Sequence, residues 1–220
     1  MLGNNINIIF IFLYTLLLLI PGYTLFQDGE ADGTISLFLR LTGLYAFVLI
    51  FIQIMLGAFM DFARRIFGPR ILNFHMTQGL VAYGLILAHP TLFLLNTVLA
   101  GVPNPLILLL PRFTTAYETY LSFGKVGFVL LTVAVFAARF RNTQFLQKHW
   151  RKFHILNYIA FWLIFVHSFN IGSDAKTPPF SWLYPVMAVL VVLSIFYRRI
   201  YIPFVKPTKA SQGAKPARQE

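Results

Sequence analysis

The chain has 220 residues, of which 58% are hydrophobic and only 11% are charged, and its formal net charge is +11. Soluble domains hold about 45–50% apolar residues, so this composition argues against a soluble domain and favours a membrane protein. The absence of cysteine excludes disulfides, cysteine-ligated iron–sulfur clusters, cysteine-based zinc sites and covalent c-type haem attachment. The positive charge indicates basic cytoplasmic loops and not nucleic-acid binding, because no soluble basic domain is apparent.

Apolar segments long enough to cross a ~30 Å hydrocarbon core follow one another along the chain. Six are predicted: Ile6–Phe26, Ile35–Met60, Leu72–Leu99, Ser122–Ala138, Phe153–Ile171 and Phe180–Tyr197. The first resembles a signal peptide but lacks a basic start, so we interpret it as a retained signal-anchor helix. Residues 101–121 contain three prolines and are expected to form an interfacial or re-entrant piece on the outer side. Residues 203–220 are polar and are expected to be a disordered tail.

Basic residues concentrate in every second connecting segment. The segments after the second and fourth spans, and the C-terminal tail, are rich in Arg and Lys. The segment after the first span has acidic residues and neither Arg nor Lys. By the positive-inside rule, this alternation predicts a multi-pass protein of the plasma membrane with an even number of spans. Both termini are then expected on the cytoplasmic side.

Four histidines lie in two of the predicted spans. His75 and His89 are fourteen residues apart on the third span, and His154 and His167 are thirteen apart on the fifth. These spacings correspond to about 21 Å and about 19.5 Å along a helix, so they predict two cross-helix pairs at matching depths. Ionisable residues inside a membrane are costly and mark functional sites. Two facing imidazoles can hold a haem iron from both sides, so we predict two b-type haems with all four histidines as iron ligands.

The same pattern leaves one geometric difficulty and some alternatives. Thirteen residues place His167 about 140° around an ideal helix from His154, so that helix must be overwound or bent, or the two haems must differ in azimuth. On the third span, the small residue Gly79 would leave room for a flat macrocycle. The alternatives are hydrogen-bonded packing histidines in a non-catalytic scaffold, a metal or proton pathway, or histidines in the substrate path of a small transporter or channel. His149, just before the fifth span, is expected to face solvent or headgroups, and is the reserve candidate for the inner ligand.

The spaced pairs His75-x13-His89 and His154-x12-His167, with the lead-in Trp150-Arg-Lys-Phe-His154, resemble the ferric reductase-like transmembrane superfamily. This superfamily includes ferric reductases, the membrane domain of NADPH oxidases and the haem subunit of bacterial methionine sulfoxide reductase systems. The resemblance covers roughly residues 35–200. It implies an all-α membrane protein, a six-transmembrane-helix bundle holding two haems b between its third and fifth helices.

The resemblance also implies how the rest of the chain is organised. Residues 1–34 would form a first transmembrane helix and an acidic outer loop, residues 35–200 the haem-binding transmembrane domain, and residues 201–220 a basic cytoplasmic tail. Arg40 falls where oxidase-like members place an arginine by the outer haem. There it would pair with a propionate or polarise a bound acceptor, and the other interpretation is an arginine that snorkels to the interface.

The function implied by the resemblance is transmembrane electron transfer from a cytoplasmic-side donor to an outer-side acceptor, which makes the chain an oxidoreductase or the electron-transfer subunit of one. No Gly-rich phosphate loop follows the sixth span, so FAD or FMN is expected on a separate flavoprotein, or a quinol is the donor. The stand-alone arrangement also resembles a haem subunit that delivers electrons to a periplasmic reductase, although that pattern lacks an inner histidine such as His75. The basic segment Arg139–Lys152 would dock an acidic flavoprotein, or is ordinary positive-inside charge.

Overall fold

The computed structural model describes residues 2–29 and 33–202, and within those ranges every regular element is a helix. The long helices are α1 (Leu2–Asp28), α2 (Thr34–Ala58), α4 (Arg70–Leu99), α5 (Ala116–Arg139), α7 (Leu156–Ile171) and α8 (Phe180–Phe196). The short ones are α3 (Met60–Phe67), α6 (Gln144–His154), the 3-10 turns η1 (Pro105–Leu109) and η2 (Asp174–Lys176), and the π-helical turn Tyr197–Tyr201.

Five of the described helices, α1, α2, α4, α5 and α8, are long and apolar enough to cross a membrane. Helices α6 and α7 together would make a sixth span, bent by 40° between them. Each predicted apolar segment therefore corresponds to a helix. The all-helical architecture is confirmed, and the predicted number of six spans is reached if α6 and α7 count as one bent span.

Apolar side chains cover both the inside and the outside of this bundle. At its centre, Phe47 of α2 is 1% exposed and stacks on Tyr184 of α8, with ring centroids 4.4 Å apart. On the outside, Phe12 of α1 is 64% exposed and Val189 of α8 is 57% exposed. Helices that are apolar all round suit a lipid environment, because lipid tails satisfy the outward faces as the core satisfies the inward ones.

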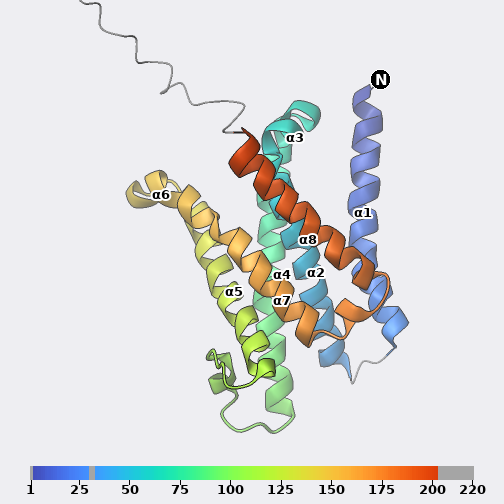
Figure 1. The fold of residues 1–220 in the computed structure, drawn as a ribbon, viewed down its shortest axis with the longest axis vertical. Coiled ribbons are helices and arrows are strands. Elements are labelled where there is room, and N and C mark those ends of the chain that lie inside the picture. The colour runs from blue at the N-terminus through green and yellow to red at the C-terminus, as the bar shows by residue number, and fades with distance from the viewer. Residues whose placement is uncertain (1, 30–32, 203–220) are drawn as a thin grey trace, which may run out of the picture.

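The central helices form two antiparallel hairpins. Helix α2 packs along α4, and α5 packs along α7, and these are the most extensive helix contacts. The two hairpins meet chiefly where α2 touches α7, with a smaller contact between α4 and α5. Helix α8 crosses the α2 side, and α1 stands beside α2 (Figure 1). The ligand candidates His75 and His89 thus belong to one hairpin, and His167 to the other.

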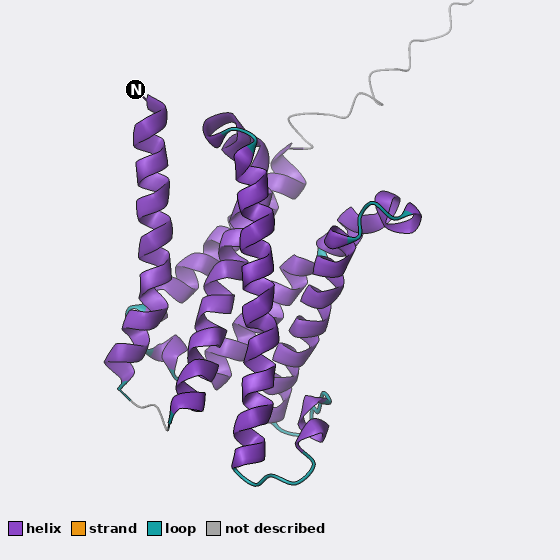
Figure 2. Ribbon diagram, turned by 180° about the vertical axis from the view of Figure 1, so that it is seen from behind, coloured by secondary structure: helices purple, strands orange, loops and turns teal. Residues whose placement is uncertain are grey.

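The two ends of the bundle differ in charge. Helices α3 and α6 lie at one end, together with the last turn of α8 and the N-terminus of α1 (Figures 1 and 2). We call this the basic end, because α3 carries Arg64 and Arg65, and α6 carries Arg151 and Lys152 in its last turn. The opposite end, where α1 ends and α2 begins, is called the Arg40 end. Helices α3 and α6 are short and amphipathic, and such helices typically lie in the membrane interface.

Residues 101–121 are only partly the interfacial piece expected from the sequence. The 3-10 turn η1 is exposed, but α5 already begins at Ala116, six residues before the predicted start. The side chain of Thr115 caps the new start by accepting a hydrogen bond from the Glu118 amide at 3.2 Å. The predicted disordered tail, residues 203–220, lies outside the described residues.

Candidate functional site

The four predicted histidines lie at two levels of the bundle, and all are half-buried. His75 and His89 are on α4, His154 is the last residue of α6, and His167 is on α7. His89 lies against Leu39 of α2 and His167 against Tyr120 of α5, both toward the Arg40 end, whereas His75 near the start of α4 and His154 at the end of α6 lie toward the basic end. The two levels expected from helix spacing are therefore present, and the pairing of the imidazoles within each level stays a prediction.

His89 is held by the backbone of α2. Its Nδ1 donates a hydrogen bond to the carbonyl oxygen of Leu39 at 3.0 Å, and this oxygen can only accept. The ring also lies against Gly43, where an added Cβ would be 2.9 Å from His89 Cε1. Because the proton is on Nδ1, the lone pair of Nε2 is left available for a ligand bond.

His167 is held in the same way by α5. Its Nδ1 donates to the carbonyl oxygen of Tyr120 at 3.0 Å, and an added Cβ at Gly124 would lie 2.8 Å from its Cγ. In both hairpins the accepting carbonyl comes four residues before the glycine. Both histidines of the Arg40 end are therefore held in the same way, by a backbone carbonyl and a glycine of the neighbouring helix. We call this pair of groups the seat of the histidine.

Neither of these glycines was predicted from the sequence to belong to the site. A signal was available on the second span, because Gly43 and Gly57 are fourteen residues apart, like His75 and His89. Gly57 indeed faces His75, although more loosely, with an added Cβ 3.8 Å from Cε1. This matching spacing is informative only if the second and third spans are known to pack against each other.

The surroundings of His75 are amides on α2 and α4. Its backbone carbonyl accepts a hydrogen bond from Gln53 Nε2 at 2.8 Å, and Gln53 is also bonded to Gln78. Its Nδ1 is buried without a hydrogen-bond partner among the described residues. Gly79 faces this cluster, since an added Cβ would lie 3.3 Å from Gln53 Nε2. Gly79 therefore makes room for an amide of α2, which differs from the role that the sequence suggested.

His154 has an amide neighbour three residues further along the chain. The amide nitrogen Nδ2 of Asn157 lies 3.2 Å from His154 Nδ1. The amide oxygen of Asn157 is buried without a partner among the described residues. Turning this amide over would let its oxygen accept the Nδ1 proton of His154.

The geometric difficulty in the fifth span is met by a bend. Helices α6 and α7 are separated at Ile155, directly after His154, and their axes differ by 40°. A bend was one of the options that the spacing of His154 and His167 left open. Neither proline nor glycine occurs near the break, and nothing in the described structure explains it.

His149 lies on another face of α6. It stands five residues before His154, about 140° around the helix, and its ring lies 5.1 Å from that of Phe145. With Lys152, Phe153 and other neighbours it borders a shallow hollow on the outside of the α6–α7 bend. The structure therefore offers no support for His149 as a reserve ligand beside His154.

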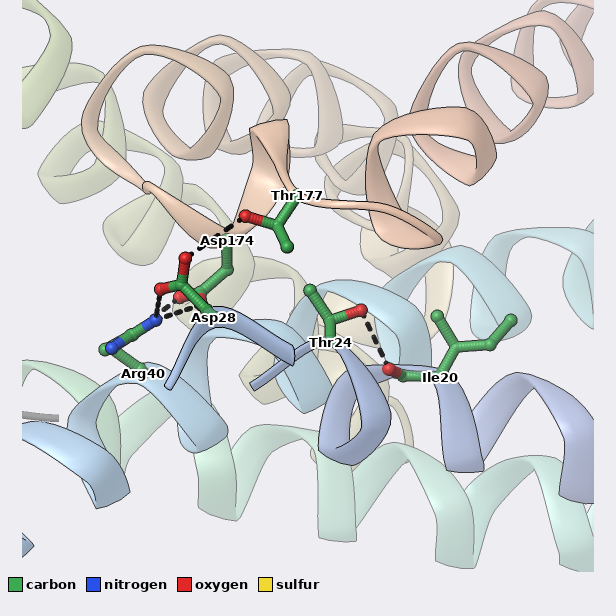
Figure 3. A network of polar contacts seen from close by, with 6 residues as sticks. All are labelled: Ile20, Thr24, Asp28, Arg40, Asp174 and Thr177. Atoms are coloured by element: carbon green, nitrogen blue, oxygen red, sulfur yellow. Dashed lines mark hydrogen bonds and ion pairs between the residues drawn. The ribbon is translucent and has the colours of Figure 1, made fainter. Parts of the chain in front are cut away.

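Arg40 belongs to an ion cluster at the Arg40 end (Figure 3). Its Nε donates to Asp174 Oδ2 at 3.0 Å, and its Nη2 pairs with both Asp174 and Asp28. Asp28 also accepts a hydrogen bond from Thr177 at 3.3 Å. Neither a snorkelling arginine nor one directed to a propionate was expected to have such partners, and a propionate would have to compete with these carboxylates.

Among residues 2–29 and 33–202, no group of three or more His, Cys, Asp or Glu side chains could hold a bare metal ion. Two imidazoles suffice for a haem, because the porphyrin supplies the other ligands of the iron. No family model, curated protein or solved structure matches this chain. The resemblance to the ferric reductase-like superfamily therefore stays a prediction that depends on the histidine spacing.

Proposed function

We propose that this chain is a transmembrane electron-transfer protein that binds two b-type haems, each through two histidines. The observation that carries the proposal is the seating of His89 and His167. Each donates Nδ1–H to a backbone carbonyl and lies over a glycine of the neighbouring helix. Metal-ligating histidines almost always have such a partner on the second nitrogen, because it fixes the tautomer and the ring orientation.

The chain's own residues fit the two haems unequally. His89 and His167 would hold one haem at the Arg40 end, where both tautomers are already set by carbonyls. His75 and His154 would hold the other at the basic end, where the orphaned Nδ1 of His75 leaves one ligand less constrained. The haems would supply one-electron redox chemistry. The protein would hold the Nδ1 protons and surround the site with apolar side chains, which tune the potentials.

The direction of transfer follows from charge. The basic end would face the cytoplasm of the plasma membrane, with both termini on that side, because Arg and Lys concentrate there. The donor would be a separate flavoprotein carrying FAD or FMN, or a quinol, and the acceptor would be reduced at the Arg40 end, as in ferric reductases. Helix α6, which ends at His154, would attract an acidic flavoprotein. A subunit that feeds a periplasmic reductase would use the same route.

A small transporter with histidines in its substrate path is the alternative of another class. The half-buried amide of Gln53 and the buried amide of Gln78, beside the unpaired Nδ1 of His75, favour it, because polar groups at this depth also line substrate paths. Such a path has no need of the glycine seats under His89 and His167. The haem proposal accounts for these seats directly.

The deciding experiment is a haem assay on protein purified from cells with ample haem supply. The pyridine haemochrome is expected to report two haems b per chain, and His75→Ala and His89→Ala are each expected to remove one. A single variant that lost both haems would indicate one shared site. Colourless wild-type protein would refute the proposal and leave the transporter.

A further inference from the structure

Two polar links join the α2–α4 hairpin to the elements of the α5–α7 hairpin among the described residues. On one side, Tyr83 of α4 donates a hydrogen bond to Thr132 of α5 at 3.2 Å. On the other side, Arg40 of α2 is paired with Asp174 of η2, which begins three residues after α7 ends. Apolar packing also joins the hairpins, as where Phe47 of α2 stacks on Phe161 of α7, but it does not fix a separation as directional bonds do.

The Arg40 link is attached close to both histidines of that end. Arg40 directly follows Leu39, whose carbonyl holds His89. Asp174 lies seven residues after His167, just past the end of the same helix. A change in the distance between Arg40 and Asp174 would therefore move the seat of one histidine relative to the other.

The link is buried and braced. The Asp174 side chain is 5% exposed and that of Arg40 is 16% exposed, so neither is freely solvated. Asp28, at the end of α1, pairs with the same Nη2 of Arg40 and accepts a hydrogen bond from Thr177 beyond η2 (Figure 3). Two carboxylates on one guanidinium hold it in a fixed orientation, because its planar fork suits carboxylate oxygens.

We propose that Arg40 and Asp174 are positioning residues that set the separation of His89 and His167, with Asp28 of α1 as their brace. This inference rests on the proposed function insofar as the two histidines share a haem. A haem shared by His89 and His167 would need the two imidazoles at a fixed separation, and a binding site works when its groups are held within about 0.5 Å. The ion cluster supplies this constraint at the Arg40 end, and no equivalent pair is described beside His75 and His154.

The first test measures the separation directly and needs no haem. The chain has no cysteine, so an introduced cysteine pair carries the only spin labels. Exposed positions Thr91 on α4 and Asn170 on α7 report the Arg40 end, and Thr77 with Ile159 report the basic end. We expect Asp174→Asn to broaden or lengthen the distance distribution of the first pair and to leave the second pair unchanged.

The matched control is Asp61→Asn, which removes an ion pair with Arg198 at the basic end, where the Asp61 side chain is 70% exposed. It is expected to leave the Thr91–Asn170 distances unchanged. Unchanged distances in Asp174→Asn as well would overturn the inference. If Asp174→Asn does not accumulate in cells, Arg40→Lys is the substitute, because it keeps the positive charge and removes the planar guanidinium. The same two spin-label pairs then measure its distances. An unchanged Arg40→Lys would then overturn it.

The second test is spectroscopic and uses the haem-loaded protein. Asp174→Asn is expected to shift the low-spin EPR signal of one haem only and to weaken its retention about 10-fold, with partial rescue by Asp174→Glu. Equal effects on both haems would overturn the inference, because they would show a general loss of structure. Colourless wild-type protein would refute the proposed function, whereas the label distances would still decide whether the ion pair spaces the helices.

Discussion

The sharpest prediction concerns Gly124, whose only evident task is to let His167 approach α5. A methyl group at this position would lie 2.8 Å from Cγ and Nδ1 of the imidazole. Non-bonded carbon atoms prefer about 3.5–4.0 Å, so in Gly124→Ala the ring must move by about 0.7 Å or more. That movement stretches the 3.0 Å hydrogen bond to Tyr120 and exceeds the tolerance of about 0.5 Å for a binding site.

The energy of this displacement can be estimated. Overpacking by one methyl group typically costs about 1–3 kcal/mol, and about 1.4 kcal/mol corresponds to a tenfold change in affinity. Haem retention at the Arg40 end should therefore fall about 5- to 150-fold. Alanine is itself favoured over glycine within a helix by about 0.5–1 kcal/mol, so α5 gains intrinsic helix propensity while the haem is lost.

The assay is haem content by pyridine haemochrome together with EPR of the oxidised protein. Gly124→Ala is expected to retain one haem, with the signal of the Arg40-end haem missing. The matched control is Gly84→Ala on α4, where an added Cβ meets nothing within 4 Å, and which is expected to keep both haems. Two haems with unchanged signals in Gly124→Ala would refute the argument that this glycine seats a ligand.

The other predictions concern the remaining seats and His149. Gly43→Ala should remove the same haem as Gly124→Ala, because its Cβ would lie 2.9 Å from His89 Cε1, and a loss of the other haem would contradict the pairing. His149→Ala should keep both haems by haemochrome assay, because its ring packs on Phe145 away from His154, and a one-haem product would reinstate it as a ligand. Asn157→Leu should weaken retention of the basic-end haem by about 10-fold in a haem-transfer assay, because it removes a partner of the His154 imidazole, and unchanged retention would exclude that role.

The spanning helices could be predicted from the sequence because length and hydropathy alone decide whether a segment fits a bilayer. The end of α4 was placed correctly at Leu99, where a loop with Gly101 follows. The start of α5 was missed, because the polar first turn that Thr115 caps carries no hydropathy signal. The position of the break between α6 and α7 at Ile155 was not predicted, because neither proline nor glycine occurs there.

The candidate site was predictable only in its histidines, whose spacing is written along single helices. The partners of these side chains come from other helices. The carbonyl of Leu39 is 50 residues from His89, and Asp174 is 134 residues from Arg40. The resemblance suggested a propionate or a bound acceptor as the partner of Arg40, but two carboxylates from α1 and η2 are a tertiary outcome that no local pattern specifies.

The division of the ligands between two hairpins has a consequence for biosynthesis. The ribosome releases α2 and α4 first, so His75 and His89 reach the membrane before their counterparts have been made. Neither level gains its second imidazole until α6 and α7 emerge, and the last clamp on the Arg40 end, Asp174, arrives later still. Under the proposed function, cofactor loading must therefore wait until α7 and η2 have left the ribosome, and a chain stopped after α5 would carry two half-sites that no haem can bridge.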